Sequence, residues 1–382
     1  MKKVSLLVFS AVLAAVVAGC TKENASEIKG FTGIEVEVGE NFGSRLYILN
    51  EGAFPGASTL DLLDFNSKKY YADLFGQANP QVVQGLGNTA NDMAVVDGHL
   101  WVLLNASNQI AILRIPDGKL IRTLAVDSPR RIALEGKYAY VSSYGAAVYG
   151  GDVTLGKVYR IHTENLETAS IEVGYQPEGL AVSGGKLYVA NSGGYNLEHD
   201  NRISVVDLAS FTLEKQMDAP LSNLNDLTAV GGKLWVSTYG ESTWTPDADG
   251  NWIQSVSVPQ SLLCVTPDGT AKVIEGVHAD KMTRSGTYIF TIGNDAEMTG
   301  GYDTCLYRVD TMDGSFRKYS FSGTDLSHVG YAYGLLVNPT SGDIYICDAS
   351  FTSGSKVHCF TRDLRHRWTV ETGIGTGHLL LQ

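Results

Sequence analysis

The sequence predicts an all-β fold: a seven-bladed β-propeller closed by the C-terminal strand pairing into the first blade. Two observations lead to this prediction. A strand motif recurs seven times, and a C-terminal segment repeats the opening of the other units. Of the 382 residues, 44% are hydrophobic and 18% charged, and there are 42 glycines. This composition is typical of a folded chain with a large core and excludes a disordered or coiled-coil protein.

An aromatic residue marks the same strand in every unit, and in all units but that of Phe290 an apolar residue follows it. These aromatics recur at intervals of 39 to 55 residues and are Tyr47, Trp101, Tyr140, Tyr188, Trp235, Phe290 and Tyr345. In most units a short strand and a glycine-containing turn precede the aromatic strand, and two further strands follow it. Four short strands per repeat are typical of a propeller blade. Eight blades or a non-propeller sandwich are the alternatives.

The first unit, which starts at Arg45, has strands two to four of a blade but no innermost strand. Residues 377–382, with the sequence GHLLLQ, resemble the innermost strands of the other units. We therefore expect the C-terminus to supply the missing strand, because a ring without it would have an open sheet edge.

The N-terminus has the features of a lipoprotein signal peptide over residues 1–19. Lys2 and Lys3 precede an apolar stretch that is too short to span a membrane. Residues 17–20, VAGC, resemble the bacterial lipobox, so we expect Cys20 to be diacylated and to become the first mature residue. An ordinary signal peptide with an incidental cysteine is the alternative. Residues 20–44 are predicted to be a lipidated tether, in which residues 34–38 can form one strand, and residues 45–382 to be the propeller.

Charge and cysteine content narrow the class of protein further. With 29 basic against 41 acidic residues, the net charge is −12, and the chain lacks the basic clusters that nucleic-acid binding requires. The four cysteines beyond Cys20 lie in apolar strand-like runs, which favours buried free thiols. Only Cys347 and Cys359 lie in neighbouring strands of one unit, where a disulfide is the alternative.

In a propeller, the segments that lead into strand one and the loops between strands two and three gather on one face, around the channel. The candidate ligand-binding residues on this face are Asn91, Asp92, Arg131, Tyr144, Glu178, Tyr195, Asn225, Asp226, Tyr239, Trp244 and Tyr333. Polar groups ringed by aromatics fit a large, flat or polyamide-like ligand. The alternative for each single residue is structural: channel polar groups bind water, and loop aromatics pack.

The sequence has no nucleophile elbow, zinc-protease helix or Walker loop. Residues 247–251 resemble part of a calcium loop but lack its closing glutamate, which favours a type I′ turn in a long hairpin. Asp92, Glu178, Asn225 and Asp226 could together hold a metal ion at the channel mouth, as in calcium-dependent lactonase propellers. The eight histidines are scattered along the chain.

Several stretches carry a more specific resemblance. They are LYILNEG (46–52), GNTANDM (87–93), YVSSYG (140–145), GYQPEG (174–179), LYVANSGGY (187–195) and YGLLVNP (333–339). Together with the lipobox they resemble the YncE-related surface lipoproteins of Bacteroidales, and within these the BtuG-like cobalamin-capturing group. The resemblance covers about residues 45–382. The loop 241–253, with Trp244 and Trp252, departs from it.

The resemblance implies a lipid-anchored outer-membrane protein that faces the cell exterior, binds a corrinoid such as cobalamin, and passes it to a TonB-dependent transporter. The corrinoid is then a ligand, and no catalytic cofactor or resident metal is expected. His378 or His199 could ligate cobalt, and an ordinary hydrogen-bonded imidazole is the alternative. A metal-assisted lactonase or lyase using Glu178 and Asp226 is the second hypothesis, and a protein- or glycan-binding propeller the third.

One expectation concerns Tyr144 and Tyr195 together. Both follow the end of an aromatic strand in consecutive units, so we expect them to project from loop tips above Asn91 and Glu178. Replacing both with alanine is then expected to spare the fold and to weaken ligand binding by about 2 kcal/mol or more.

Overall fold

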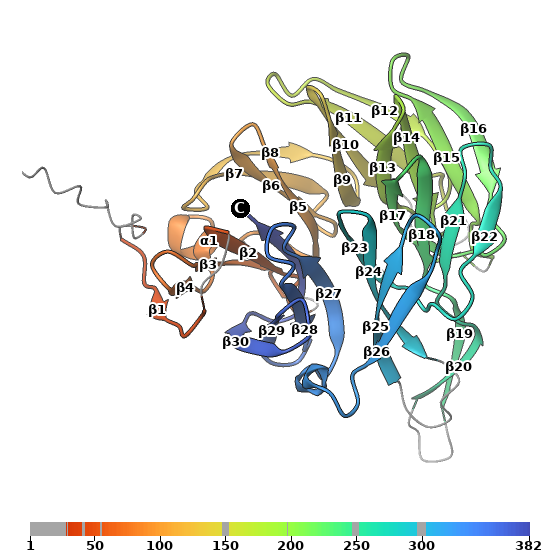
Figure 1. Cartoon of the computed structure of the whole chain (residues 1–382). Helices are drawn as coiled ribbons and strands as arrows, with labels where there is room; N and C mark the ends of the chain where they lie inside the picture. The colour runs from red at the N-terminus through yellow and green to blue at the C-terminus, as the bar shows by residue number, and fades with distance from the viewer. Residues whose placement is uncertain are drawn as a thin grey trace, which may run out of the picture.

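The structure is a computed structural model of the chain, and it describes residues 28, 30–39, 43–53, 56–146, 153–196, 198–246, 252–295 and 303–382. The signal peptide of residues 1–19 and the lipidated Cys20 lie outside these residues, so both stay predictions. Seven antiparallel sheets stand around a common axis (Figure 1). The innermost strands contact one another in the order β31, β5, β9, β13, β17, β23, β27 and back to β31. The predicted seven-bladed propeller is confirmed.

Blades two to seven each come from one continuous stretch of chain. Blades two to four contain β5 (Ala90–Val96), β6 (His99–Leu104), β7 (Gln109–Arg114), β8 (Leu120–Ala125), β9 (Pro129–Glu135), β10 (Tyr138–Ser143), β11 (Lys157–His162), β12 (Thr168–Glu172), β13 (Pro177–Ser183), β14 (Lys186–Asn191), β15 (Arg202–Asp207) and β16 (Thr212–Asp218). Blades five to seven contain β17 (Leu224–Val230), β18 (Lys233–Thr238), β21 (Leu262–Val265), β22 (Ala271–Val273), β23 (Lys281–Ser285), β24 (Tyr288–Asp295), β25 (Asp303–Asp310), β26 (Phe316–Ser320), β27 (Ala332–Val337), β28 (Ile344–Asp348), β29 (Ser355–Phe360) and β30 (His366–Thr372).

Blade one joins the two ends of the propeller. Its strands are β31 (Thr376–Leu381), β2 (Arg45–Asn50), β3 (Thr59–Asp64) and β4 (Lys69–Tyr71). β31 lies antiparallel to β2, with Tyr47 opposite Leu380, and Ser44 N donates to Gln382 O at 2.8 Å just beyond the paired strands. The predicted closure by the C-terminal strand is therefore confirmed.

Part of the segment predicted to be a tether contacts the propeller. β1 (Ile34–Glu35) pairs with β4 at the outer edge of blade one. Val38 is buried in an apolar cluster with Tyr70 and Trp368, from blades one and seven. The alternation of residues 34–38 thus adds a short outer strand and one buried side chain to blade one.

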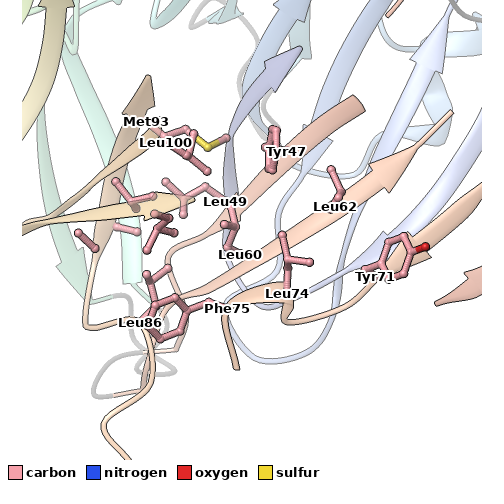
Figure 2. Packing of buried hydrophobic residues seen from close by; sticks show 14 of the residues in the cluster. Tyr47, Leu49, Leu60, Leu62, Tyr71, Leu74, Phe75, Leu86, Met93 and Leu100 are labelled. Carbon is pink, nitrogen blue, oxygen red and sulfur yellow. The ribbon is translucent and has the colours of Figure 1, made fainter. Parts of the chain in front are cut away.

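The seven repeated aromatic residues, here called the aromatic column, lie on strand two of the blades. They join neighbouring blades. The described residues form seven apolar clusters, each shared by two adjacent blades. In the cluster between blades one and two, Tyr47 packs with Leu49, Met93 and Leu100 (Figure 2). Because burial of a large apolar side chain contributes on the order of 2–3 kcal/mol, these clusters stabilise the ring blade by blade.

Two additions interrupt the regular repeats. Blade five has a hairpin of its own sheet, β19 (Glu241–Pro246) and β20 (Trp252–Val258), inserted between strands two and three. The predicted hairpin is present, whereas its turn at residues 247–251 lies outside the described residues. The short helices α1 (Leu74–Ala78) and η1 (Asp325–His328) were not predicted. In the described part of the chain, no helix has the length and apolar character to cross a membrane.

The four cysteines of the propeller are free thiols, three of them buried. Cys347 lies opposite Val357, and Cys359 opposite Tyr345, in the adjacent strands β28 and β29. The two sulfurs are thus held at diagonal positions in one apolar cluster. The expectation of buried free thiols is confirmed.

Candidate functional site

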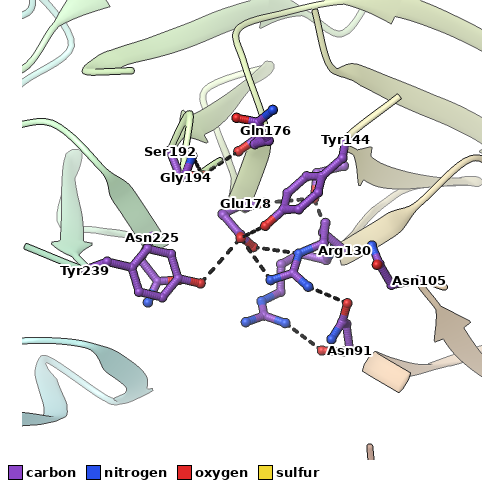
Figure 3. A network of polar contacts seen from close by, with 12 residues as sticks. Asn91, Asn105, Arg130, Tyr144, Gln176, Glu178, Ser192, Gly194, Asn225 and Tyr239 are labelled. Carbon is purple, nitrogen blue, oxygen red and sulfur yellow. Dashed lines mark hydrogen bonds and ion pairs between the residues drawn. The ribbon is translucent and has the colours of Figure 1, made fainter. Parts of the chain in front are cut away.

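The mouth of the channel is formed where the chain enters the innermost strands. In six of the seven blades the pairing of strands one and two shifts register at this end. In β13 the shift falls between Pro177 and Leu180, and Glu178 lies within it. Because a bulge redirects side chains out of the regular alternation, Glu178 reaches the polar network at the mouth (Figure 3).

A buried ion pair between Arg130 and Glu178 is the centre of this network. Arg130 Nε donates to Glu178 Oε2 at 3.1 Å, and Nη2 donates to Oε1 at 2.9 Å. Arg130 Nη1 donates to Asn91 Oδ1 at 2.5 Å, and Glu178 is only 1% exposed. A bidentate pair fixes both groups in orientation. It also connects blades two, three and four at the mouth.

Three tyrosines surround the ion pair. Tyr144 and Tyr239 donate their hydroxyls to Glu178 Oε1, Tyr239 at 3.3 Å. The Arg130 guanidinium lies 4.7 Å from the centre of the Tyr144 ring, a favourable cation–π position. Tyr195 contacts Tyr144 edge to face, with ring centres 5.9 Å apart, and is 52% exposed. Tyr195 is therefore the aromatic surface that this network presents to solvent.

The network is electrically neutral overall. Burial alone would raise the pKa of Glu178, but Arg130, Arg131 and the hydrogen bonds from Arg130 and Tyr144 hold it below its ordinary value. Burial and the Glu178 carboxylate raise the pKa of Tyr144 and Tyr239 well above the usual range. Glu178 is therefore ionised near neutral pH, where Arg130 balances its charge and both phenols keep their protons.

A pocket of about 210 Å³ opens beside the ion pair, between blades three, four and five. At about 30 Å³ per water molecule, it has room for roughly seven waters or one polar group of side-chain size. The residues around it come from first strands and from loops on the same face. They are Arg130, Tyr144, Glu178, Ser192, Gly194, Tyr195, Asn223 and Tyr239.

A second pocket of about 180 Å³ is lined by residues one step further along the innermost strands, among them Asp92, Arg131, Asp226, Lys281 and His378. Here the carboxylates connect neighbouring blades. Asp92 Oδ2 accepts from Ile132 N at 3.0 Å, and Asp226 Oδ2 accepts from Met282 N at 3.2 Å. For Asp92 and Asp226 the observed contacts therefore support the structural alternative.

The structure separates the predicted site residues into groups. Tyr144, Glu178, Tyr195 and Tyr239 share the first pocket, and Asp92, Arg131 and Asp226 line the second. Asn91 and Asn225 are buried at the mouth. Tyr333, in blade seven, donates to Glu51 Oε1 at 3.0 Å and lies 5.2 Å from the Lys281 ammonium. The side chain of Trp244 lies outside the described residues.

The expectation that Tyr144 projects from a loop tip is wrong. Tyr144 is only 6% exposed, because its hydroxyl is drawn to Glu178 and its ring packs under Arg130. Replacing it would remove a buried hydrogen bond and part of the packing around the ion pair. Tyr144 therefore belongs to the interior of the site, whereas Tyr195 lies at its exposed surface.

The histidines considered as cobalt ligands have different surroundings. His199 Nδ1 lies 2.6 Å from Glu241 Oε2 and so is an ordinary hydrogen-bonded imidazole. His378 lines the second pocket, where burial and the nearby cations lower its pKa well below the usual value. Three other histidines, although scattered in sequence, lie together beside blade seven, His366 with its ring centre 4.5 Å from His328 and 5.9 Å from His358.

The residues that line the first pocket and were missing from the predicted set include Arg130, Ser192, Gly194 and Asn223. Asn223 belongs to a repeated turn. The residues two positions before Asn91, Arg130, Glu178 and Asn225 all have positive φ, namely Thr89 at 55°, Ser128 at 37°, Gln176 at 39° and Asn223 at 59°. The backbone oxygen of each accepts from the residue after strand two. Aligning the repeats on these polar residues would have revealed the position.

No metal centre is formed by the predicted carboxylates. Within the described residues, no three His, Cys, Asp or Glu side chains are arranged to hold one ion. Glu178 and Asp226, the two carboxylates of the enzyme hypothesis, line different pockets.

The comparisons with known proteins bear on the fold alone. No protein-family model and no curated protein sequence matches the chain. Among solved structures, the chain is similar to a Synechocystis apocarotenoid oxygenase, with 11% identity, a TM-score of 0.58, and 92% of this chain and 95% of the other covered. It is also similar to AztD of Citrobacter koseri, with 11% identity, a TM-score of 0.51 and coverage of 88% and 97%. Hydrazine synthase of Kuenenia stuttgartiensis has 16% identity, a TM-score of 0.55 and coverage of 73% and 84%. AztD supports the propeller fold, and at these identities none of the three assigns a function.

The variant Asp92→Asn is expected to alter how stability changes with pH. Burial raises the pKa of Asp92 from 3.8 to about 6, although Arg131 acts in the opposite direction. The folded chain then binds this proton more tightly than the unfolded chain, so the contribution of Asp92 to stability falls as the pH rises from 3.8 to about 6. Thermal melts of both proteins between about pH 4 and pH 7 test this. The parent should lose stability relative to the variant as the pH rises, and parallel curves would contradict the assignment.

Proposed function

We propose that this protein is a binding module that captures a corrinoid over the channel mouth. It is held on the outer face of the outer membrane by lipid on Cys20 and passes the corrinoid to a TonB-dependent transporter. The observation that carries the binding proposal is the composition of the mouth, where a neutralised ion pair is surrounded by tyrosines. The membrane and transporter parts rest on the lipobox-like residues 17–20 and on the resemblance described above.

The mouth suits a large, flat, uncharged ligand with polar arms. Tyr195 offers an exposed ring on which a macrocycle can pack. The pocket of about 210 Å³ beside it is too small for a macrocycle and accepts one polar arm. Further around the mouth, Tyr331 and Phe351 are 53% and 40% exposed and pack with Tyr333. Aromatic groups in blades four and seven can thus contact opposite edges of one ligand.

The arrangement of carboxylates favours binding over metal-assisted catalysis. Both oxygens of Glu178 accept hydrogen bonds from Arg130, and Oε1 accepts two more from tyrosines. A general base acts best when its pKa lies near the operating pH. The lowered pKa of Glu178 makes it a weaker base than an ordinary carboxylate.

The variant Tyr195→Ala tests the binding proposal. Loss of an exposed aromatic anchor is expected to weaken cobalamin binding by about 2 kcal/mol, roughly 30-fold in Kd, with little change in thermal stability. Tyr288→Ala is a matched control, because Tyr288 is also a partly exposed tyrosine, with 36% exposure. It lies at the start of β24, strand two of blade six, at the end of the strand that points away from the channel mouth. Equal cobalamin affinity in both variants would show that the ligand does not pack on Tyr195.

A further inference from the structure

Asn223 has a buried oxygen that no group of the described residues satisfies. Its side chain is 8% exposed, and Nδ2 donates to Gly240 O at 2.8 Å. A carbonyl can only accept, so this bond fixes the amide orientation and leaves Oδ1 as the free end. Within the part of the chain that the structure describes, Oδ1 has no hydrogen-bond partner, and Asn223 lines the pocket of about 210 Å³. A buried acceptor left unpaired costs about 1–3 kcal/mol.

Most donors around the same pocket already have acceptors among the described residues. Arg130 directs Nε, Nη1 and Nη2 to Glu178 and Asn91. Tyr144 and Tyr239 donate to Glu178. Ser192 Oγ donates to Gln176 O at 2.9 Å and accepts from Gly194 N at 3.1 Å. The buried side-chain atom of this pocket that stays unpaired among the described residues is an acceptor, Asn223 Oδ1.

The charges around the pocket limit which chemical groups of a ligand can bind there. A carboxylate would place its oxygens against Asn223 Oδ1 and beside the Glu178 carboxylate, both of which repel them. A cation would lie in a desolvated pocket next to the Arg130 guanidinium, which repels it. A neutral group that carries N–H or O–H avoids both costs.

We propose that this pocket is a subsite for a neutral hydrogen-bond donor, the NH₂ of a primary carboxamide, and that it rejects the corresponding carboxylate. Asn223 Oδ1 accepts from the amide, and Tyr195 covers the arm that carries it. This inference rests on the proposed function in one respect, since the amide arms of a corrinoid are the intended donors. The selectivity itself depends only on the pocket and can be measured without a corrinoid.

Three probes of similar shape test separately whether binding needs a hydrogen-bond donor and whether it needs a neutral group. They are propionamide, its ketone analogue 2-butanone, which lacks the donor, and propionate, which is charged. Binding is measured for the folded full chain by ligand-observed NMR at millimolar probe concentration. We expect propionamide to bind about tenfold more tightly than 2-butanone, as the loss of one neutral hydrogen bond predicts. Propionate should give no saturable binding.

The variant Gly194→Ala tests whether propionamide binds in this pocket. Gly194 does not have a positive φ, and an added Cβ would lie 3.3 Å from Ser192 Oγ and 3.7 Å from Asn223 Oδ1, where it covers the acceptor. Gly330→Ala is a matched control, because its φ is also not positive and its Cβ would lie 3.3 Å from Asp348 Oδ1, outside the pocket. Propionamide binding should be lost in Gly194→Ala and kept in Gly330→Ala.

The outcomes distinguish this inference from the proposed function. Propionate binding, equal binding of propionamide and 2-butanone, or no fragment binding at all would overturn the donor subsite, even if cobalamin binds. Fragment selectivity without cobalamin binding would support the subsite and contradict the corrinoid proposal. The comparison of the three probes on the parent protein decides the inference even if Gly194→Ala does not fold.

Discussion

Deleting residues 377–382 is expected to destabilise the protein by about 5 kcal/mol or more. The deletion removes nearly all of β31, the innermost strand of blade one, which pairs with the inner edge of β2. Ladder hydrogen bonds contribute about 1 kcal/mol each, and the buried side chains that lose cover add to this loss. The chain ends would no longer be joined, and the ring would open between blades one and seven.

Chemical denaturation followed by circular dichroism measures this loss. The matched control removes Gln382 alone, which leaves the strand Thr376–Leu381 intact and sacrifices only the hydrogen bonds to Ser44 and Arg45. We expect the control to remain close to the parent. A six-residue deletion with an unchanged unfolding free energy would show that the ring does not depend on this closure.

The variant Glu178→Ala is expected to destabilise the fold by about 3–5 kcal/mol. Removal of the carboxylate leaves the buried Arg130 guanidinium without its counter-ion, and the hydroxyls of Tyr144 and Tyr239 lose their acceptor. Breaking a buried pair from one side costs this much because the remaining charge stays desolvated. The double variant Glu178→Ala/Arg130→Ala should recover part of the loss, since it removes the unpaired charge.

The lowered pKa of Glu178 also predicts how the stability of the fold changes with pH. Its pKa is lowered in the folded state from an ordinary value of 4.5. The stabilisation is therefore fully present above pH 4.5 and is lost as the pH falls through the folded-state pKa. The difference in unfolding free energy between the parent and Glu178→Gln should shrink below pH 4.5. A constant difference down to the acid transition would mean that the pair does not contribute as an ion pair.

The propeller itself was predictable because its signals are local and periodic. Each column aromatic lies in a short strand-like segment preceded by a turn or another strand, so the strand order within a blade follows from the repeat. The closure was predictable for the same reason, since residues 377–382 resemble the strand that blade one lacks. The outer strand at Ile34–Glu35 also follows from simple alternation.

The sequence predicted where the site lies and some of its residues, but not the contacts between them. The face and several members, including Glu178, Tyr195 and Tyr239, follow from the position of loops in a propeller. The inward orientation of the Tyr144 side chain does not follow from loop position, because it depends on Arg130 and Glu178 from two different blades. The role of Asp92 likewise depends on a backbone N–H of the next blade. Such contacts between repeats leave no period in the sequence.

Titration of the purified protein with cyanocobalamin, followed by its visible absorbance after equilibrium dialysis, tests the proposed capture most directly. We predict saturable binding of one corrinoid per chain at the mouth that Glu178 and Tyr195 define. Retention of no more dye than in the protein-free chamber, at every concentration up to about the millimolar range that marks weak association, would contradict it.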